Sequence, residues 1–148
     1  MIRPFTFSDL DRILQIELQS FPKSPYDWAT FVNLHYLYPE TFLVYVDKTR
    51  DREEGQIGGY LIFSPDGHII SIAVHPHDRR KGIGKELLQR VMDAAPHKRI
   101  WAEVRKSNQG AQAFYLRMGF QITGVVPSYY GNEDALIVRS RPPAPGSR

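Results

Sequence analysis

The stretch of sequence that decides the fold, residues 69–88, reads IISIAVHPHDRRKGIGKELL. Its apolar, β-branched beginning predicts a strand over His68–Val74, and the apolar positions that recur after Gly84 predict a helix over Lys85–Ala95. The polar segment between them carries basic side chains and two glycines. Glycines let a backbone approach an anion closely, and the N–H groups and dipole at a helix start attract negative charge. The stretch therefore predicts a phosphate-binding loop.

Two better-known phosphate loops do not fit this segment. The P-loop pattern is G-x-x-x-x-G-K-S/T, whereas a single residue separates Gly82 from Gly84. The dinucleotide-binding pattern G-x-G-x-x-G requires a further glycine where this sequence has Leu87. Taken alone, the segment fits a solvated basic turn as well as a phosphate site, so its assignment depends on the rest of the chain.

The remaining sequence alternates between helical periodicity and hairpin signals. It predicts the order β-α-α-β-β-β-α-β-α-β-β, which is a mixed α+β sheet and not a doubly wound parallel one. Gly58-Gly59 is expected to form a bulge or a close backbone approach, and the charged segment Asp47–Gly55 a hairpin loop. The other elements are expected at Ile2–Phe5, Ser8–Phe21, Pro25–Tyr38, Thr41–Val46, Gln56–Phe63, Ile100–Val104, Asn108–Met118, Phe120–Val126 and Asp134–Val138.

The composition limits the classes of protein and of site. The chain has 148 residues, 42% of them hydrophobic, which suits one domain with one core. The absence of cysteine excludes disulfides and a cysteine nucleophile, and the five histidines lack metal-ligand spacing, so we expect no metal and read these histidines as non-catalytic. No apolar run is long enough for a membrane span, and a cytoplasmic protein is expected. We expect one domain over residues 1–139 and a disordered proline-rich tail over 140–148.

Four motifs follow one another along the chain. The first is the strand with its R-x-x-G-x-G loop, the second is Ala102–Asn108, the third is Ala113–Phe120, and the fourth is the late hairpin Tyr129–Ala135. Together they resemble the GNAT superfamily of N-acetyltransferases over residues 1–138, and the hairpin resembles its RimI-type branch, which acetylates protein N-termini. The resemblance implies a mixed, mostly antiparallel sheet of six to seven strands with about four helices and a splayed pair of central strands.

The resemblance also implies acetyl-CoA as cosubstrate. In the family, the backbone of the strand binds the pantetheine arm, and the backbone of the glycine loop binds the pyrophosphate. The side chains of the strand also fit an apolar core, and the basic side chains of the loop also fit a solvated surface. Asn108 fits the N-cap of the next helix as well as a cofactor contact. The residues implied in cofactor binding are Ile72, Ala73, Val74, Arg79, Arg80, Lys81, Gly82, Ile83, Gly84, Lys85 and Asn108.

Two side chains are candidates for the chemistry. An amine must lose a proton to attack a thioester at neutral pH, and a carboxylate in an apolar strand is costly unless it has partners, which makes Glu103 the candidate base. Strand alternation puts Glu103 and Arg105 on one face, so a plain surface ion pair is the alternative. Tyr115 matches the family's general acid and otherwise fits a core aromatic.

The acceptor is the least constrained part of the sequence. The resemblance places it near Phe21 and Tyr26 and near Tyr129 and Tyr130, and implies the N-terminus of a protein, a ribosomal protein among them. Acetylation of lysine side chains or small amines is an alternative, and so is a non-catalytic acyl-CoA-binding module. The net charge of +3 is mild, and no basic helix predicts nucleic-acid binding. No membrane partner is expected. The protein is expected to be a monomer or a homodimer.

Overall fold

The computed structural model describes residues 1–49 and 52–142 of the chain. The chain forms two compact units. The first consists of Met1–Ser64 and Ile70–Arg90, and the second of Pro65–Ile69 and Val91–Arg148. The chain therefore passes from one unit to the other three times, at residues 64, 69 and 90.

Helices and strands follow the order that the sequence predicts. The strands are β1 (Ile2–Pro4), β2 (Phe42–Thr49), β3 (Arg52–Phe63), β4 (Ile69–Val74), β5 (Trp101–Arg105), β6 (Gln121–Val126) and β7 (Ala135–Arg139). The helices are α1 (Leu10–Ser20), α2 (Trp28–Leu37), α3 (Ile83–Ala94) and α4 (Gln109–Arg117). Short 3-10 turns precede α1 and α3, at Phe7–Asp9 (η1) and Pro76–Asp78 (η2).

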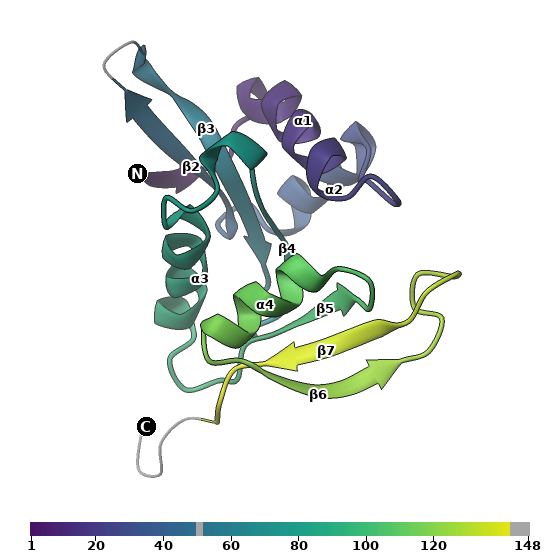
Figure 1. The fold of residues 1–148 in the computed structure, drawn as a ribbon. Helices are drawn as coiled ribbons and strands as arrows, with labels where there is room; N and C mark the ends of the chain where they lie inside the picture. The colour runs from purple at the N-terminus through teal and green to yellow at the C-terminus, as the bar shows by residue number, and fades with distance from the viewer. Residues whose placement is uncertain (50–51, 143–148) are drawn as a thin grey trace. The chain divides into compact units, whose positions relative to one another are not determined.

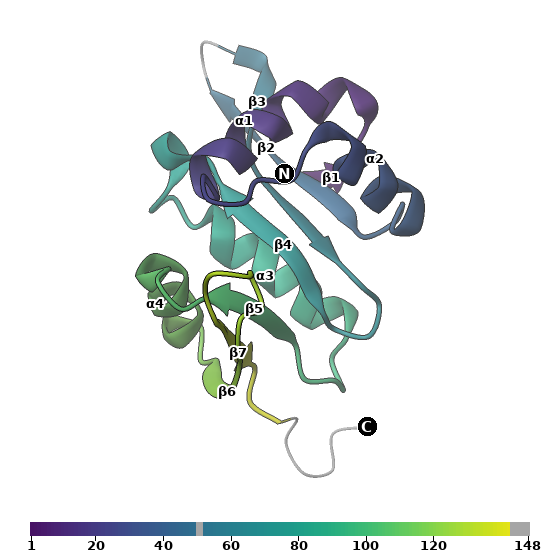
Figure 2. The ribbon, with the colours of Figure 1, turned by 90° about the vertical axis from the view of Figure 1, so that its right-hand side faces the viewer.

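The first unit is built on a sheet of order β1-β2-β3-β4. β1 and β3 both pair with β2 in antiparallel register, so that Val44 lies opposite Arg3 on one side and Tyr60 on the other. Helices α1 and α2 cover one face of this sheet, and the first turns of α3 lie on the other (Figures 1 and 2). The core lies under α1 and α2, where Ile13, Phe31 and Tyr60 are fully buried.

The paired glycines of β3 allow α3 to approach the sheet. Tyr45 pairs with Gly59 and Val46 with Ile57, which leaves Gly58 as the extra residue of a bulge. A Cβ on Gly59 would lie 2.8 Å from the Ala73 carbonyl oxygen. It would also lie 3.2 Å from a side-chain carbon of Ile83 and 3.3 Å from one of Leu87, both on α3. Both parts of the expectation for Gly58-Gly59 are therefore confirmed, and a side chain here would push the sheet and α3 apart.

The second unit is built on a sheet of order β5-β7-β6, antiparallel throughout. Helix α4 lies on one face of it (Figure 1). An isolated parallel bridge joins His68 to Trp101, whose N–H donates to the Gly67 carbonyl at 3.0 Å. At the other end, Ser140 is buried, and its hydroxyl and backbone are hydrogen-bonded to the backbone of Ile100. The first residue of the expected tail, Ser140, is therefore bonded to the second unit, and residues 143–148 of that tail lie outside the described residues.

Both N-terminal helix starts differ from expectation. Ser8 was expected to begin the first helix, but the capping box is formed by Thr6 and Asp9 around η1, and α1 begins at Leu10. The second helix was expected from Pro25, but its cap is Asp27, whose Oδ1 accepts a hydrogen bond from the Thr30 N–H at 2.9 Å. A carboxylate is favoured over a hydroxyl here because it also meets the positive end of the helix dipole.

The first hairpin is longer than expected. Asp47–Gly55 was expected to be a loop because it is charged, yet Asp47 pairs with Gln56, and Thr49 pairs with Arg52. A two-stranded hairpin is held by backbone hydrogen bonds, so charged residues can extend it into solvent. Residues 50 and 51 lie outside the described residues.

The expected fold class is confirmed. The described residues form a mixed α+β structure with four helices and two antiparallel sheets, of four and three strands. The strand before the glycine loop, β4, was expected to splay from its neighbour, and it belongs to a different sheet from β5, the next strand along the chain. Within the described part of the chain, none of the helices combines the length and the apolar character that crossing a membrane requires.

Candidate active site

The glycine loop has the geometry of an anion site. Gly82 has φ +81° and accepts the first helical hydrogen bond of α3, from the Glu86 N–H at 3.0 Å. The N–H groups of Ile83, Gly84 and Lys85 then have no partner within the helix. Apart from the chain neighbours of Gly82, no heavy atom of the described residues lies within 4 Å of a Cβ built on it, so the loop is open to a ligand on this side. These features suit a diphosphate group such as that of acetyl-CoA.

The basic side chains of the loop differ in their partners. Lys81 Nζ lies 3.1 Å from an oxygen of Asp78 and 3.6 Å from one of Asp47, and the hydrogen bond to Asp78 raises its pKa. Arg79 is turned back on its own strand, where Nε donates to the Val74 carbonyl at 3.2 Å. Arg80 is exposed with φ +69°. The backbone, more than any one of these side chains, is what the loop presents to an anion.

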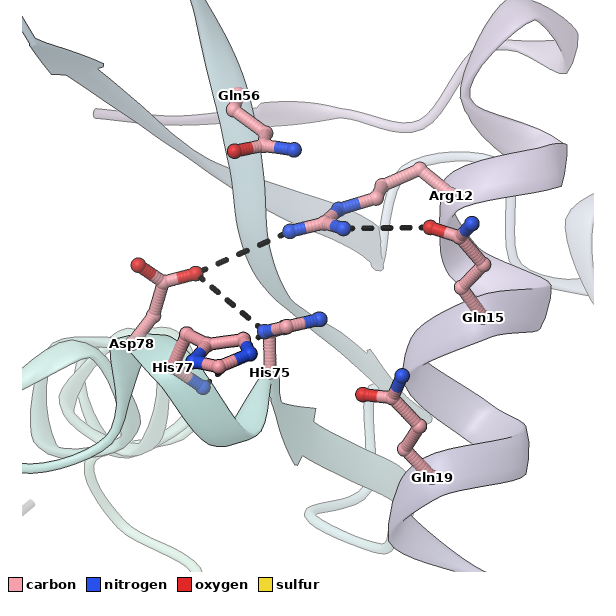
Figure 3. A pocket seen from close by; sticks show the side chains of 7 residues that line it. All are labelled: Arg12, Gln15, Gln19, Gln56, His75, His77 and Asp78. Carbon is pink, nitrogen blue, oxygen red and sulfur yellow. Dashed lines mark hydrogen bonds and ion pairs between the residues drawn. The ribbon is translucent and has the colours of Figure 1, made fainter.

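A polar hollow of about 440 Å³ lies beside the start of this loop. Figure 3 shows Asp78 directed toward both Arg12 and His75, at 3.9 Å and 4.0 Å. The His75 ring is buried and accepts the His77 N–H at 3.1 Å, and desolvation followed by the nearby Arg12 charge lowers its pKa. The hollow includes none of the expected site residues, and its side chains fix η2, from which the glycine loop departs.

The strand expected to bind the pantetheine arm is β4. It lies at the edge of its sheet, so one side of its backbone is unpaired within that sheet. Ala73 is buried in the core of the first unit, and Ile72 and Val74 are half-buried. The Ala73 side chain has the core role that the sequence left open, which leaves the backbone of the strand as the part able to bind a ligand.

The two expected acceptor residues of the first unit lie on one segment between α1 and α2. Phe21 ends α1, where its N–H donates to the Glu17 carbonyl at 2.8 Å. The ring of Tyr26 packs edge-on against Phe31, with centroids 5.7 Å apart. Both side chains are half-buried against the core, so the segment has a defined path.

In the second unit, Glu103 has a partner that the sequence did not indicate. Its Oε2 lies 2.8 Å from Nε2 of His68, and the His68 ring stacks on Trp101 at 4.9 Å. Arg105 pairs instead with Glu133 at 3.0 Å, so the surface pair considered above is replaced by two others. From their spacing in the sequence, all five histidines are expected to be non-catalytic. The fold nevertheless places His68 in hydrogen-bond contact with the candidate base Glu103.

Tyr115 lies on α4 and is 4% exposed. Its ring packs against Phe120 with centroids 5.2 Å apart, so it does have the role of a core aromatic. Burial, then the charge of Glu103 and then Tyr130, raise the pKa of Tyr115. The hydroxyl therefore keeps its proton at neutral pH and is influenced directly by the candidate base.

The late hairpin brings both of its tyrosines to the same region of the second unit. Tyr129 and Tyr130 contact each other edge-on at 4.8 Å, and the guanidinium of Arg105 lies 4.1 Å above the Tyr130 ring. Partial burial, then the charge of Glu103, raises the pKa of Tyr129. The fold thus groups Glu103, Tyr115, Tyr129 and Tyr130, although up to 27 residues separate them in sequence.

Asn108 caps α4, and its Oδ1 accepts the Ala111 N–H at 3.0 Å. This is the capping role that the sequence left open beside a cofactor contact. Among the described residues, no cluster of histidine and acidic side chains has the arrangement of a metal site.

Known proteins resemble this chain over nearly its whole length. The model of the acetyltransferase (GNAT) family matches residues 10–120. An uncharacterised N-acetyltransferase of Methanocaldococcus jannaschii is 36% identical, over 99% of this chain and 95% of its own length. The N-alpha-acetyltransferase of Sulfurisphaera tokodaii is 31% identical, over 93% of this chain and 90% of its own.

Solved structures give the same result. Naa20 of Chaetomium thermophilum, in complex with a bisubstrate analogue, superposes with a TM-score of 0.80 at 28% identity, covering 96% of this chain and 86% of its own. The ribosomal-protein-S18-alanine N-acetyltransferase of Escherichia coli superposes with a TM-score of 0.73 at 25% identity, covering 100% of this chain and 97% of its own. The chain therefore belongs to the acetyltransferase (GNAT) family, and it is an N-acetyltransferase.

Proposed function

We propose that this enzyme moves the acetyl group of acetyl-CoA to the N-terminal α-amino group of a protein, with Glu103 as general base and Tyr115 as general acid. The observation that carries the proposal is the group of side chains around Glu103. One carboxylate influences the pKa of both Tyr115 and Tyr129 and is held by His68. Acid, base and acceptor-binding candidates therefore belong to one electrostatic environment.

Acetyl-CoA supplies an activated acetyl thioester. The edge backbone of β4 at Ile72–Val74 binds its pantetheine arm, and the N–H groups at the start of α3 bind its pyrophosphate. The open side of Gly82 and the unpaired edge of β4 support this assignment. Arg80 and Lys85 add positive charge from the surface, and Asn108 contributes while capping α4.

Glu103 accepts the proton of the attacking amine. An α-amino group has a pKa of about 7.7–8.0, so a large part of it is protonated at neutral pH and a base is needed. An ionised carboxylate only accepts hydrogen bonds, so the Nε2–H of His68 donates to Oε2 and orients the group. The other oxygen then takes the amine proton, directly or through water.

As the amine nitrogen bonds to the carbonyl carbon and the C–S bond breaks, Tyr115 donates its proton to the sulfur. The proton taken by Glu103 then passes to the Tyr115 oxygen, directly or through water, which restores both groups. A phenol is a weaker acid than a thiol by about 1.5 pKa units, so the transfer to sulfur is uphill by about 2 kcal/mol in water. Burial raises the pKa of a thiol as well as that of a phenol, which keeps the two groups matched inside a closed site. The donation is therefore coupled to departure of the thiolate.

The residues assigned to the acceptor are aromatic. Tyr129 and Tyr130 of the second unit offer hydroxyl groups and rings to a peptide backbone, and Phe21 and Tyr26 of the first unit offer half-buried rings. Two similar proteins named above are an N-alpha-acetyltransferase and an enzyme that acetylates the alanine of a ribosomal protein. These names support a protein N-terminus, such as that of a ribosomal protein in the cytoplasm, over a small amine.

The proposal is tested with purified enzyme and acetyl-CoA, measuring CoA release. The acceptors are peptides with varied free N-termini, a lysine peptide with a blocked N-terminus, and a polyamine. We expect turnover with a subset of the free N-termini and little with the other two classes. A preference for the blocked lysine peptide or the polyamine would refute the assigned acceptor, and CoA release with none of them would refute the catalytic proposal.

A further inference from the structure

A second glutamate, Glu17 on α1, is buried in the first unit and takes no part in the chemistry proposed above. It is 2% exposed. Its Oε1 accepts the backbone N–H of Tyr26 at 3.0 Å, and its Oε2 accepts a short hydrogen bond from the Tyr60 hydroxyl. The Tyr60 hydroxyl also lies 2.8 Å from Oγ of Ser71. We call these four residues the Glu17 network.

The Glu17 network is costly for a role in packing alone. Among the described residues, no basic side chain forms a salt bridge with Glu17, and its burial raises its pKa. Tyr60 is fully buried between the rings of Phe31 and Phe42, at 5.6 Å and 6.3 Å. An apolar residue at position 17 would fill this space without a desolvation penalty, so the carboxylate is better explained by what its oxygens hold in place.

The two ends of the network lie on segments with different tasks. Tyr26 belongs to the segment between α1 and α2 that is proposed to bind the acceptor. Ser71 lies on β4 and directly precedes Ile72–Val74, the backbone proposed to bind acetyl-CoA. Three side chains therefore connect the two segments through the core, along a path of hydrogen bonds that the structure defines at every step.

We propose that Glu17, Tyr60 and Ser71 are positioning residues that couple the acceptor-binding segment at Tyr26 to the acetyl-CoA-binding strand β4, so that each ligand tightens the binding of the other. This inference rests on the ligand assignments of the proposed function. Hydrogen bonds have strict geometry, so a shift of β4 on ligand binding is passed to the Tyr26 backbone through Tyr60 and Glu17. Such coupling is reciprocal in the binding free energies of the two ligands.

The experiment measures the Kd of an acceptor peptide with and without saturating CoA by calorimetry. In the wild type, we expect CoA to tighten peptide binding about fivefold or more. Ser71→Ala breaks only the last link and leaves Glu17 with both donors. We expect this variant to bind the peptide alone, and CoA alone, within about twofold of the wild type, and to lose most of the tightening.

A pair of substitutions at position 17 separates positioning from packing. In Glu17→Gln, the amide oxygen still accepts from Tyr26, and the amide NH₂ donates to the Tyr60 oxygen, whose hydroxyl then donates to Ser71. We expect this variant to keep the coupling and a peptide KM within about threefold of the wild type. Glu17→Leu has similar volume but no polar atoms, and we expect its peptide KM to rise about tenfold with little change in kcat.

Matched controls exist in the same unit. Ser20→Ala removes a buried hydroxyl of α1 that has no hydrogen-bond partner in the described structure, and Tyr36→Phe removes one from a tyrosine of α2 that is 83% exposed. Both are expected to keep the full tightening. Thermal melts confirm that each variant is folded.

Three results would overturn the inference. They are an undiminished CoA effect in Ser71→Ala, no CoA effect in the wild type, and a Glu17→Leu enzyme with the wild-type KM. A wrong acceptor assignment is recognised separately, since it appears as wild-type turnover of another acceptor class. The coupling is then measured with that acceptor.

Discussion

Glu17 and Glu103 are the same residue type in two different situations. Glu17 is 2% exposed, and protein groups donate to both of its oxygens. The Glu103 side chain is 18% exposed, and within the described part of the chain its hydrogen-bond partner is His68, on one oxygen. A carboxylate that is fully bonded inside the protein can hold elements together, whereas one with an available oxygen and access to solvent can exchange protons.

The largest difference between the two sites is expected when each glutamate is replaced by glutamine. We expect Glu103→Gln to lower kcat about 10²–10⁴-fold at pH 7, because the amide cannot accept the amine proton. The loss should shrink as the pH rises above the pKa of the amine, near 8, where the acceptor deprotonates itself. Glu17→Gln is the control, with an expected change in kcat below about threefold. A Glu103→Gln deficit that stays constant between pH 6.5 and 9.5 would remove Glu103 from its role.

The next largest effect concerns the acid. Tyr115→Phe keeps the ring that packs on Phe120 and removes the hydroxyl, so the protein should remain folded. We expect kcat to fall about 10²-fold with the peptide KM little changed, measured at saturating acetyl-CoA. Unchanged turnover would mean that Tyr115 serves the core alone.

A smaller effect is expected from the partner of Glu103. His68→Ala removes the donor to Oε2 and the ring stacked on Trp101, and should lower kcat about tenfold. His68→Gln retains a donor of similar reach and should recover most of that loss. Equal kcat values in the two variants would show that the hydrogen bond does not orient the base.

The smallest expected effect is a change in folding stability with pH that depends on Glu17. Burial raises the folded-state pKa of Glu17, so the folded protein binds more protons than the unfolded chain between the two pKa values. Its contribution to stability is therefore fully present below the unfolded pKa and is lost as the pH rises through the folded pKa. Denaturant titrations should show this fall in the wild type from about pH 4.5 upward and not in Glu17→Gln. Parallel curves for the two proteins would contradict the raised pKa.

The features that the sequence predicts well are local ones. The glycine loop, the Gly58-Gly59 bulge and the order of elements follow from neighbouring residues and their spacing. The partners of the two glutamates could not be predicted in this way. Glu103 is 35 residues from its partner His68 in the sequence, and Glu17 is 43 residues from its partner Tyr60. Such contacts depend on strand register and helix placement, which no local pattern encodes.

Helix starts were missed for a different reason. Ser24 and Pro25 together fit the start of a helix, and so does Asp27, which is the residue that caps α2. Ser and Asp are about equally good caps, so tertiary packing decides between them. Here Tyr26 packs on Phe31 and its N–H is bound by Glu17, which keeps this segment out of the helix.

The division of the chain into two units has a consequence for its biosynthesis. Pro65–Ile69 belongs to the second unit but is translated between the two parts of the first. As the polypeptide leaves the ribosome, the last residue of the first unit, Arg90, emerges first, while the bridge of His68 cannot form before Trp101 has emerged. Neither unit can be obtained as a single uninterrupted fragment, so a nascent chain stalled after residue 90 would carry the glycine loop without either catalytic candidate.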